Sequence, residues 1–132
     1  MTSGTTYEFK IEARNEYGYS AYSNTLTELA AYIPEIPVSV TTEMDGSQVK
    51  VLWTLPSANG SPITAYKIFV QEIDTGTFTQ ESTDCVGTDA TVISNRYCHI
   101  QVTTLLAAPY NMDGGDSVFA KVIAVNLYGE TA

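Results

Sequence analysis

Two cysteines and one histidine are the side chains of this sequence with the widest chemical range. Cys85 and Cys98 stand 13 residues apart, and His99 directly follows the second cysteine. These residues are too few for a four-ligand zinc site. We predict a disulfide between Cys85 and Cys98, which would imply an oxidising compartment, and two reduced core thiols are the alternative. Catalytic and metal roles of the thiols are the least favoured.

No other group of side chains has the spacing of a catalytic or metal site. His99 lacks a nucleophile motif and a paired acid, so we interpret it as an ordinary strand residue. Asp113 and Asp116 could offer oxygens to calcium, but an EF-hand spacing with its terminal glutamate is absent, which favours turn-forming acids. We therefore predict no catalytic residue, no metal site and no cofactor.

A glycosylation sequon occurs at Asn59, which is followed by Gly60 and Ser61. The sequon lies in the stretch PSANGSP, whose glycine and prolines are typical of an exposed loop. Such short motifs also arise by chance, and Asn-Gly suits a tight turn. We predict a glycan on Asn59 if the protein passes through a eukaryotic secretory pathway.

Composition excludes several classes of partner. The 132 residues include 15 acidic and 6 basic side chains, and 44% are hydrophobic, which suffices for a folded domain. The net charge of −9 argues against binding to nucleic acid or to an anionic membrane surface. No apolar run approaches the roughly 20 residues of a membrane span, so we predict no membrane insertion. The first residues lack the pattern of a secretory signal, and an export signal would lie outside this sequence.

Alternating hydrophobicity predicts an all-β chain without an amphipathic helix. The stretch TYEFKIEAR alternates as a half-buried strand, and a more polar strand follows within residues 21–29. Pro34 and Pro37 in AAYIPEIP mark a stiff linker. Beyond it we expect a hairpin around Asp45-Gly46, and then further strands in ITAYKIFVQEI, TFTQEST, CHIQVTTL and SVFAKVIAVN.

An internal repeat is the most informative feature of the sequence. Residues 1–21 match residues 112–132 at an offset of 111, with eight of the 21 positions identical. The identical pairs are Met1 and Met112, Gly4 and Gly115, Lys10 and Lys121, Ala13 and Ala124, Asn15 and Asn126, Tyr17 and Tyr128, Gly18 and Gly129, and Ala21 and Ala132. The same strand and turn therefore occur twice, one domain length apart, as in a tandem array.

These residues resemble the fibronectin type III module. TYEFKIEARNEYGYS is similar to the family pattern Tyr-x-Phe-x-Val-x-Ala-x-Asn-x-x-Gly-x-Ser, and VKVLWTLP and SPITAYKIFV resemble its second and third strands. The resemblance implies an immunoglobulin-like β-sandwich. It assigns residues 1–30 to the last strands, F and G, of one repeat, and residues 31–132 to strands A to F of the next, which lacks strand G. Tyr7 matches the tyrosine of the family's corner hydrogen bond, whereas Val118 stands there in the second copy.

The two copies of strand F differ on their outward face. The first copy is charged there, but the second has Phe119, Ile123 and Val125 beside Lys121, and Phe69 on the adjacent strand would enlarge the patch. A solvated sheet face does not normally carry such residues. We therefore predict an interface at Phe69, Phe119, Ile123 and Val125.

The leading hypothesis is a non-catalytic structural and interaction module of a repetitive extracellular or cell-surface protein. Its partners would be itself or neighbouring repeats, assembled head-to-tail into a fibre. Residues 7–29 of one unit would complete the sandwich of the next, either by strand addition or because both units belong to one longer polypeptide. The seven-residue linker spans at most about 25 Å, which disfavours completion within one unit. The alternative is a spacer or ligand-binding module of a larger extracellular enzyme or receptor. An enzyme is the least favoured class.

Overall fold

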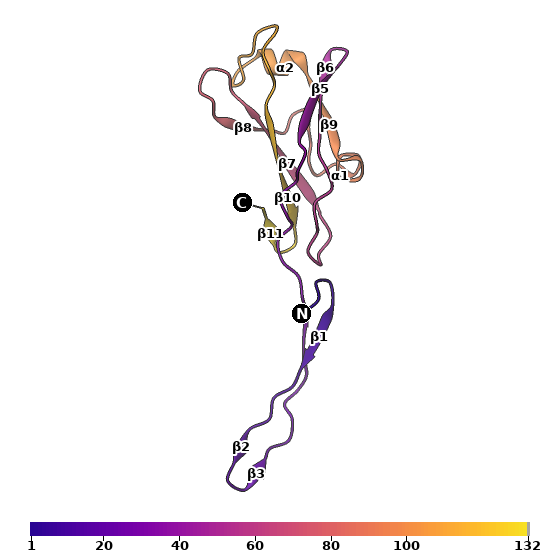
Figure 1. Ribbon diagram of the computed structural model, residues 1–132, viewed down its shortest axis with the longest axis vertical. Helices are drawn as coiled ribbons and strands as arrows, with labels where there is room; N and C mark the ends of the chain where they lie inside the picture. Colours follow the sequence, from indigo (N-terminus) through magenta and orange to yellow (C-terminus); the bar gives the residue numbers. More distant parts are fainter. Residues whose placement is uncertain (132) are drawn as a thin grey trace.

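The structure is a computed structural model that describes residues 1–131. A β-sandwich forms one end of an elongated molecule, and a long N-terminal hairpin forms the other end (Figure 1). Ala132, which ends the predicted sandwich and pairs with Ala21 in the repeat, lies outside the described residues.

The N-terminal hairpin contains two short antiparallel ladders. At its base, β1 (Thr6–Phe9) pairs with β4 (Leu26–Leu29). At its tip, β2 (Arg14–Asn15) pairs with β3 (Gly18–Tyr19). Gly18 has a φ of +139°, a conformation that glycine adopts without a steric penalty, so the tight turn follows from the sequence.

Two antiparallel sheets form the sandwich. The first has the order β5-β6-β9, and the second has the order β11-β10-β7-β8. The strands of the first sheet are β5 (Thr41–Asp45), β6 (Gln48–Leu52) and β9 (Tyr97–Gln101). Those of the second are β7 (Ala65–Gln71), β8 (Phe78–Glu81), β10 (Ala120–Asn126) and β11 (Gly129–Glu130).

The core lies between the sheets and follows the predicted alternation. Every second residue of β6 and β7 is buried, which confirms the shared inward face of Val49, Val51 and Trp53. The rings of Trp53 and Tyr66 meet edge to face, with their centres 4.9 Å apart. All residues of the buried core lie between Val49 and Ala124, so the hairpin contributes none of them.

Two short helices correct the expectation of a helix-free chain. α1 (Ala90–Asn95) follows Asp89, whose carboxylate accepts a hydrogen bond from the Thr91 N–H and caps the helix. α2 (Val102–Leu106) takes the end of the predicted strand CHIQVTTL, so β9 stops at Gln101. Each helix is about one turn long and buries one apolar side chain, which is too little for a periodic pattern to be visible in the sequence.

The predicted all-β fold class and two-sheet sandwich are confirmed, and the helices only connect strands. Among the described residues, none of the helices has the length and apolar character needed to cross a membrane.

Candidate assembly surfaces

The four predicted interface residues differ in exposure. Phe69, Ile123 and Val125 are half-buried, whereas Phe119, just before β10, is 58% exposed. Phe69 lies opposite Lys121 in the β7–β10 register, so charge interrupts the apolar row. Of the four, Phe119 is the side chain most available to a neighbour.

A groove of about 410 Å³ runs beside β10. Its walls are Ile36, Pro37, Val40, Phe69, Phe78, Lys121, Val122 and Ile123. The Lys121 ammonium lies 4.0 Å from the centre of the Phe78 ring, a cation–π contact on the outer face. The linker after Pro34 thus supplies part of the cover that we expected from another molecule, and it leaves a channel next to β10.

One edge of β10 is mostly open within residues 1–131. β7 pairs with β10 from Ala120 to Val125 on one side, whereas β11 pairs only with Val125 and Asn126 on the other. Beyond β11, Thr131 exchanges hydrogen bonds with Ala124. Alternate residues of a strand direct their amide and carbonyl groups to the same edge, so Ala120 and Val122 present theirs to the groove. This edge can pair with another strand.

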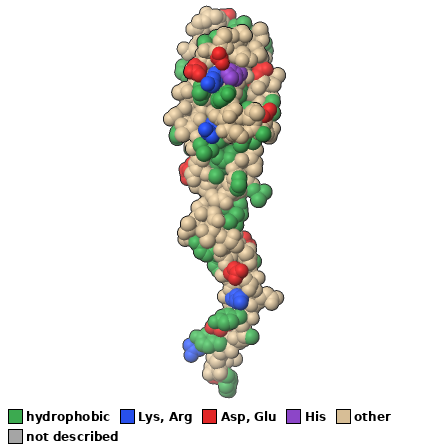
Figure 2. Space-filling view, turned by 90° about the vertical axis from the view of Figure 1, so that its right-hand side faces the viewer, with side chains coloured by type: hydrophobic (Ala, Val, Ile, Leu, Met, Phe, Trp, Pro, Cys, Tyr) green, Lys and Arg blue, Asp and Glu red, His purple; other side chains and the backbone are tan. Residues whose placement is uncertain are grey.

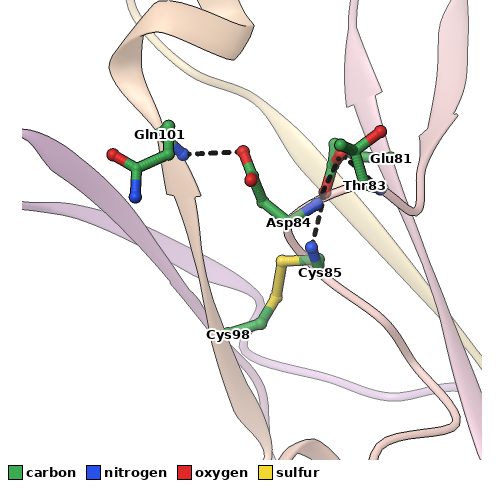
Figure 3. Close-up of a disulfide and its surroundings, with 6 residues drawn as sticks. All are labelled: Glu81, Thr83, Asp84, Cys85, Cys98 and Gln101. Atoms are coloured by element: carbon green, nitrogen blue, oxygen red, sulfur yellow. Dashed lines mark hydrogen bonds between the residues drawn. A yellow bond between two sulfur atoms is a disulfide. The ribbon is translucent and has the colours of Figure 1, made fainter.

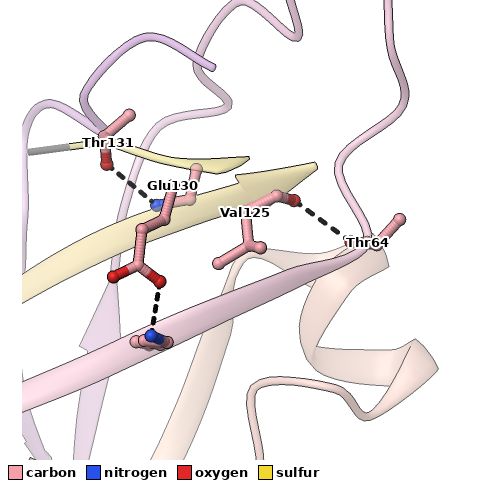
Figure 4. Close-up of polar contacts among 6 residues, drawn as sticks. Thr64, Val125, Glu130 and Thr131 are labelled. Carbon is pink, nitrogen blue, oxygen red and sulfur yellow. Dashed lines mark hydrogen bonds and ion pairs between the residues drawn. The ribbon is translucent and has the colours of Figure 1, made fainter. Parts of the chain in front are cut away.

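The end of β10 and the tip of the hairpin share their hydrogen bonds as well as their sequence. The Thr131 N–H donates to the Ala124 carbonyl over 3.1 Å. Its hydroxyl accepts from the Ala124 N–H (Figure 4). Ser20 makes the same two bonds with Ala13, at 2.8 and 3.0 Å. In the sandwich, further bonds hold this turn, from Thr64 to the Val125 carbonyl and between Lys67 and Glu130 (Figure 4). The 111-residue repeat is therefore a repeat of conformation.

The base of the hairpin is duplicated too. The Thr5 N–H donates to the Thr2 carbonyl at 3.2 Å, and the Asp116 N–H donates to the Asp113 carbonyl at 3.1 Å. The third residue of each turn is a glycine with positive φ, +78° for Gly4 and +105° for Gly115. A side chain on Gly115 would meet no atom within 4 Å, so this second copy of the turn is open.

Apolar side chains of the hairpin are exposed, and one of them has a buried counterpart in the sandwich. Phe9 and Ile11 are 45% and 75% exposed, and Leu26 on the facing strand is 57% exposed. Val122, which corresponds to Ile11, is 5% exposed in the sandwich core. Figure 2 shows hydrophobic side chains along the narrow N-terminal part of the molecule. Such a surface is typical of a segment that packs against a further layer.

Tyr7 forms the corner hydrogen bond that the resemblance assigns to it. Its hydroxyl accepts from the Thr2 N–H at 2.6 Å, and this bond holds the pKa of Tyr7 below its ordinary value. Val118 has no such group and instead packs against the sandwich core.

The hairpin base rests on the loop that contains the sequon. A side chain at Gly60 would lie 2.7 Å from the Ala30 carbonyl oxygen and 2.8 Å from the Ser3 hydroxyl, and it would clash with the Gly4 amide. Only glycine permits so close a contact. The φ of +88° at Gly60 also favours glycine, since residues with a side chain rarely adopt it. Gly60 is therefore the contact point between hairpin and sandwich.

Two asparagines hold the linker that joins hairpin and sandwich. The Asn126 amide, which is 4% exposed, donates to the carbonyls of Tyr32, at 2.7 Å, and Ala58, at 3.2 Å. The Asn59 amide donates to the Ile33 carbonyl at 2.9 Å, and the Tyr32 N–H donates to the Asn59 carbonyl at 3.0 Å. We call these bonds the linker clamp. They fix the backbone on both sides of Ile33.

Glycosylation of Asn59 stays a prediction. Its amide nitrogen donates both to Ile33 and to a Glu35 carboxylate oxygen at 3.2 Å, and Ser61 of the sequon is buried. A glycan would replace one of the two amide hydrogens, so one of these two hydrogen bonds would be lost.

The predicted disulfide is present between Cys85 and Cys98, with Cα atoms 5.4 Å apart. It ties the loop after β8 to β9 and thus joins the two sheets. The buried Glu81 carboxylate accepts from the backbone N–H groups of Thr83, Asp84 and Cys85 at 2.8, 3.1 and 2.7 Å (Figure 3). Asp84 accepts from the Gln101 N–H at 3.0 Å (Figure 3). Two acids therefore shape the loop that carries Cys85.

His99 and the remaining acids have structural partners. His99 Nε2 lies 3.0 Å from the Asp45 carboxylate on the outer face of the three-stranded sheet. The Asp113 N–H donates to the Asp116 carboxylate, which closes the turn that we predicted there. Among residues 1–131, no three metal-binding side chains converge.

Sequence reasoning missed Glu81 and the clamping role of Asn126. Glu81 ends a short strand and looks like any surface acid in the sequence. Asn126 had a detectable signal, since the repeat places an asparagine twice in the same turn, and in both copies its oxygen accepts from the N–H two residues on.

The chain is similar to several known proteins. The chain is 36% identical over 78 residues to the human phosphatidylinositol phosphatase PTPRQ, and 35% identical over 78 residues to the rat protein of that name. These matches cover 58% of this chain and only 3% of the length of either relative. No family model matches the chain. The FN1–FN3 domains of chicken CNTN1 align with 98% of this chain and 40% of theirs, at 18% identity and a TM-score of 0.44.

The strand order places the chain among the immunoglobulin-like sandwiches, with three strands facing four. Within that class, the Trp53 strand, the Tyr66 strand and the Asn126 turn resemble those of the fibronectin type III module.

Proposed function

We propose that the protein is a non-catalytic structural and interaction module of a repetitive extracellular or cell-surface protein that assembles head-to-tail into a fibre. Residues 1–30 are then the last strands of one fibronectin type III repeat, and residues 31–132 are strands A to F of the next. The supporting observation is the duplicated turn and strand at both ends of one chain. An elongated molecule whose sandwich and hairpin carry related strands suits a linear array (Figure 1).

The disulfide and the charge support an extracellular location. Disulfides persist in oxidising compartments, and the net charge of −9 disfavours nucleic acid as a partner. A glycan on Asn59 would fit the same location, although it would remove one of the two hydrogen bonds that the Asn59 amide donates.

A second candidate is a spacer or ligand-binding module in a much larger extracellular enzyme or receptor. The match to a phosphatase favours it, because the chain spans only about 3% of that protein. Any activity of such a polypeptide would then lie outside these residues.

Sedimentation velocity over a range of concentrations, followed by negative-stain microscopy, tests the proposal. We expect linear oligomers that grow with concentration, and we expect F119K, at the exposed position beside the open edge, to shorten them. The matched control is V86K, since Val86 is also exposed, at 44%, but lies on the disulfide loop. A parent protein that stays monomeric at high concentration would contradict assembly and favour the spacer function.

A further inference from the structure

Residues 1–20 contact residues 21–30 through the β1–β4 ladder and through several further hydrogen bonds. The Ser23 N–H donates to the Ile11 carbonyl at 2.8 Å, and the Ile11 N–H donates to the Ser23 hydroxyl at 3.1 Å. At the base, the Gly4 N–H donates to the Ala30 carbonyl, and the Ala30 N–H donates to the Thr5 carbonyl. Together with the Gly60 loop, the segment 21–30 therefore forms a seat for residues 1–20.

The backbone groups of residues 1–20 that make these bonds have counterparts 111 residues later. Val122 corresponds to Ile11, Gly115 to Gly4, and Asp116 to Thr5. Gly115 and Asp116 form the same turn as Gly4 and Thr5, and Gly115 is open. Val122 lies at the open edge of β10. Residues 112–131 are thus a second possible occupant of the seat.

We propose that residues 112–131 of a second copy of this chain displace residues 1–20 from the seat, so that residues 21–30 complete the sandwich of the second copy as its strand G. This inference rests on the proposed function, because it names the strands through which head-to-tail assembly proceeds. The first 20 residues are then a cap that the chain carries in place of its neighbour.

The hairpin predicts the register of the exchanged strand. Phe9 lies opposite Leu26 and Glu8 opposite Thr27, so an offset of 111 places Ala120 opposite Leu26 and Phe119 opposite Thr27. Thr131 already fills the position opposite Ala124, where the incoming strand ends. No backbone bond is lost overall, since each bond to residues 1–20 is replaced by its counterpart.

The gain comes from apolar burial. Leu26 and Leu29 are 57% and 37% exposed on the hairpin, and β4 would enter the groove beside Val122. Residues 1–20 include no buried residue, so their release exposes little. The hairpin projects away from its own sandwich (Figure 1), which leaves room for the second copy at that end. The contact joins unlike surfaces, so it propagates as a chain.

A cross-linking experiment on the full chain tests the exchange. T27C combined with F119C places two cysteines on facing strands of different copies, at exposed positions. At the open edge of β10 the bonding groups belong to even residues such as Ala124, whereas the Phe119 carbonyl accepts from Gln71 on the other edge. Phe119 and Thr27 would therefore form a non-hydrogen-bonded pair, with Cα atoms about 4.5 Å apart, within disulfide range. We expect an interchain ladder on non-reducing gels after mild oxidation.

Two controls define the register and the mechanism. Y22C with F119C is five residues out of register and should lose the ladder. E8C with T27C links β1 to β4 within one chain, as their pairing allows, and should give only monomers until it is reduced.

Deletion separates the cap from the donated strand. Removal of residues 1–20 should shift assembly to lower protein concentration, because the seat no longer has an internal competitor. Removal of residues 1–30 should abolish assembly, since β4 is lost as well. Both deletions leave the core intact.

The outcomes distinguish the two proposals. If the parent assembles but T27C/F119C gives no interchain ladder, or if the two deletions behave alike, the exchange is wrong and head-to-tail assembly stands. If the parent and the 1–20 deletion both stay monomeric at every concentration, both proposals are wrong.

Discussion

Glu81 shows how one buried carboxylate can organise a loop. It is 2% exposed, and three successive backbone N–H groups donate to it. Bonds to a charged acceptor are stronger than neutral ones, which offsets part of the cost of burying the charge. Because Cys85 supplies one of these N–H groups, the acid also sets the position of one half of the disulfide.

The raised pKa of Tyr110 predicts a loss of folding stability at alkaline pH. Burial, and then the charges of Glu81 and Glu72, raise the pKa of Tyr110 from 10.0 to about 12. Since the folded-state pKa is the higher one, the unfolded chain loses its proton first, and stability falls as the pH rises from about 10 to about 12. Below pH 10 Tyr110 is protonated in both the folded and the unfolded chain, so this group does not make stability depend on pH there.

Y110F tests this sign. We expect the stability difference between the parent and Y110F, measured by guanidinium unfolding, to move in favour of the variant as the pH rises from 9 to above 11. Burial also raises the pKa of Tyr66, but Tyr66 is present in both proteins and cancels in the difference. A difference that does not depend on pH would contradict the assignment.

At the scale of elements, the linker clamp predicts different effects for two equivalent asparagines. N126A removes a buried amide that serves the carbonyls of Tyr32 and Ala58, so we expect a loss of about 1–3 kcal/mol in the free energy of unfolding. N15A changes the same turn position in the hairpin, where the asparagine is exposed, and should cost less than about 0.5 kcal/mol.

Chemical denaturation of N126A, N15A and the parent checks this contrast. N126D tests whether the donor role of the Asn126 amide matters. A carboxylate at this position has no N–H group to donate to the carbonyls of Tyr32 and Ala58. It should therefore be at least as destabilising as N126A. Equal effects at positions 126 and 15 would show that the turn, rather than the clamp, needs the asparagine.

The strands could be predicted from sequence because burial alternates along them. Val49, Val51 and Trp53 share a face that the period-two pattern shows directly. The helix after Asp89 could not be predicted, because a single turn is held by one cap and one buried valine. The interface prediction did not foresee that the linker covers part of the same face. Ile36 and Pro37 lie beside Ile123, and no local sequence pattern reveals such a contact. The clamp depends on atoms that are far apart in sequence, and only the repeated asparagine hinted at it.

At the scale of the whole molecule, the two copies of one turn have very different surroundings. The Thr131 N–H and the Ser20 N–H make equivalent bonds, but Thr131 is 3% exposed inside the sandwich and Ser20 is exposed at the hairpin tip. An isolated two-stranded hairpin is at best marginally stable in water. The local stability of the two copies should therefore differ although their geometry does not.

Hydrogen exchange of matched amides measures this difference and links it to assembly. In a dilute solution of the chain we expect slow exchange at Thr131 and fast exchange at Ser20 and Ser23, because opening the hairpin exposes almost no core. On assembly, Ser23 should become protected, since its N–H passes from Ile11 to Val122 of the neighbour, whereas Ser20 should stay unprotected because the cap is released. Equal protection of Ser20 and Thr131 at high dilution would show that the hairpin is stable without a partner, and protection of Ser20 in the assembled state would show that the cap remains in its seat.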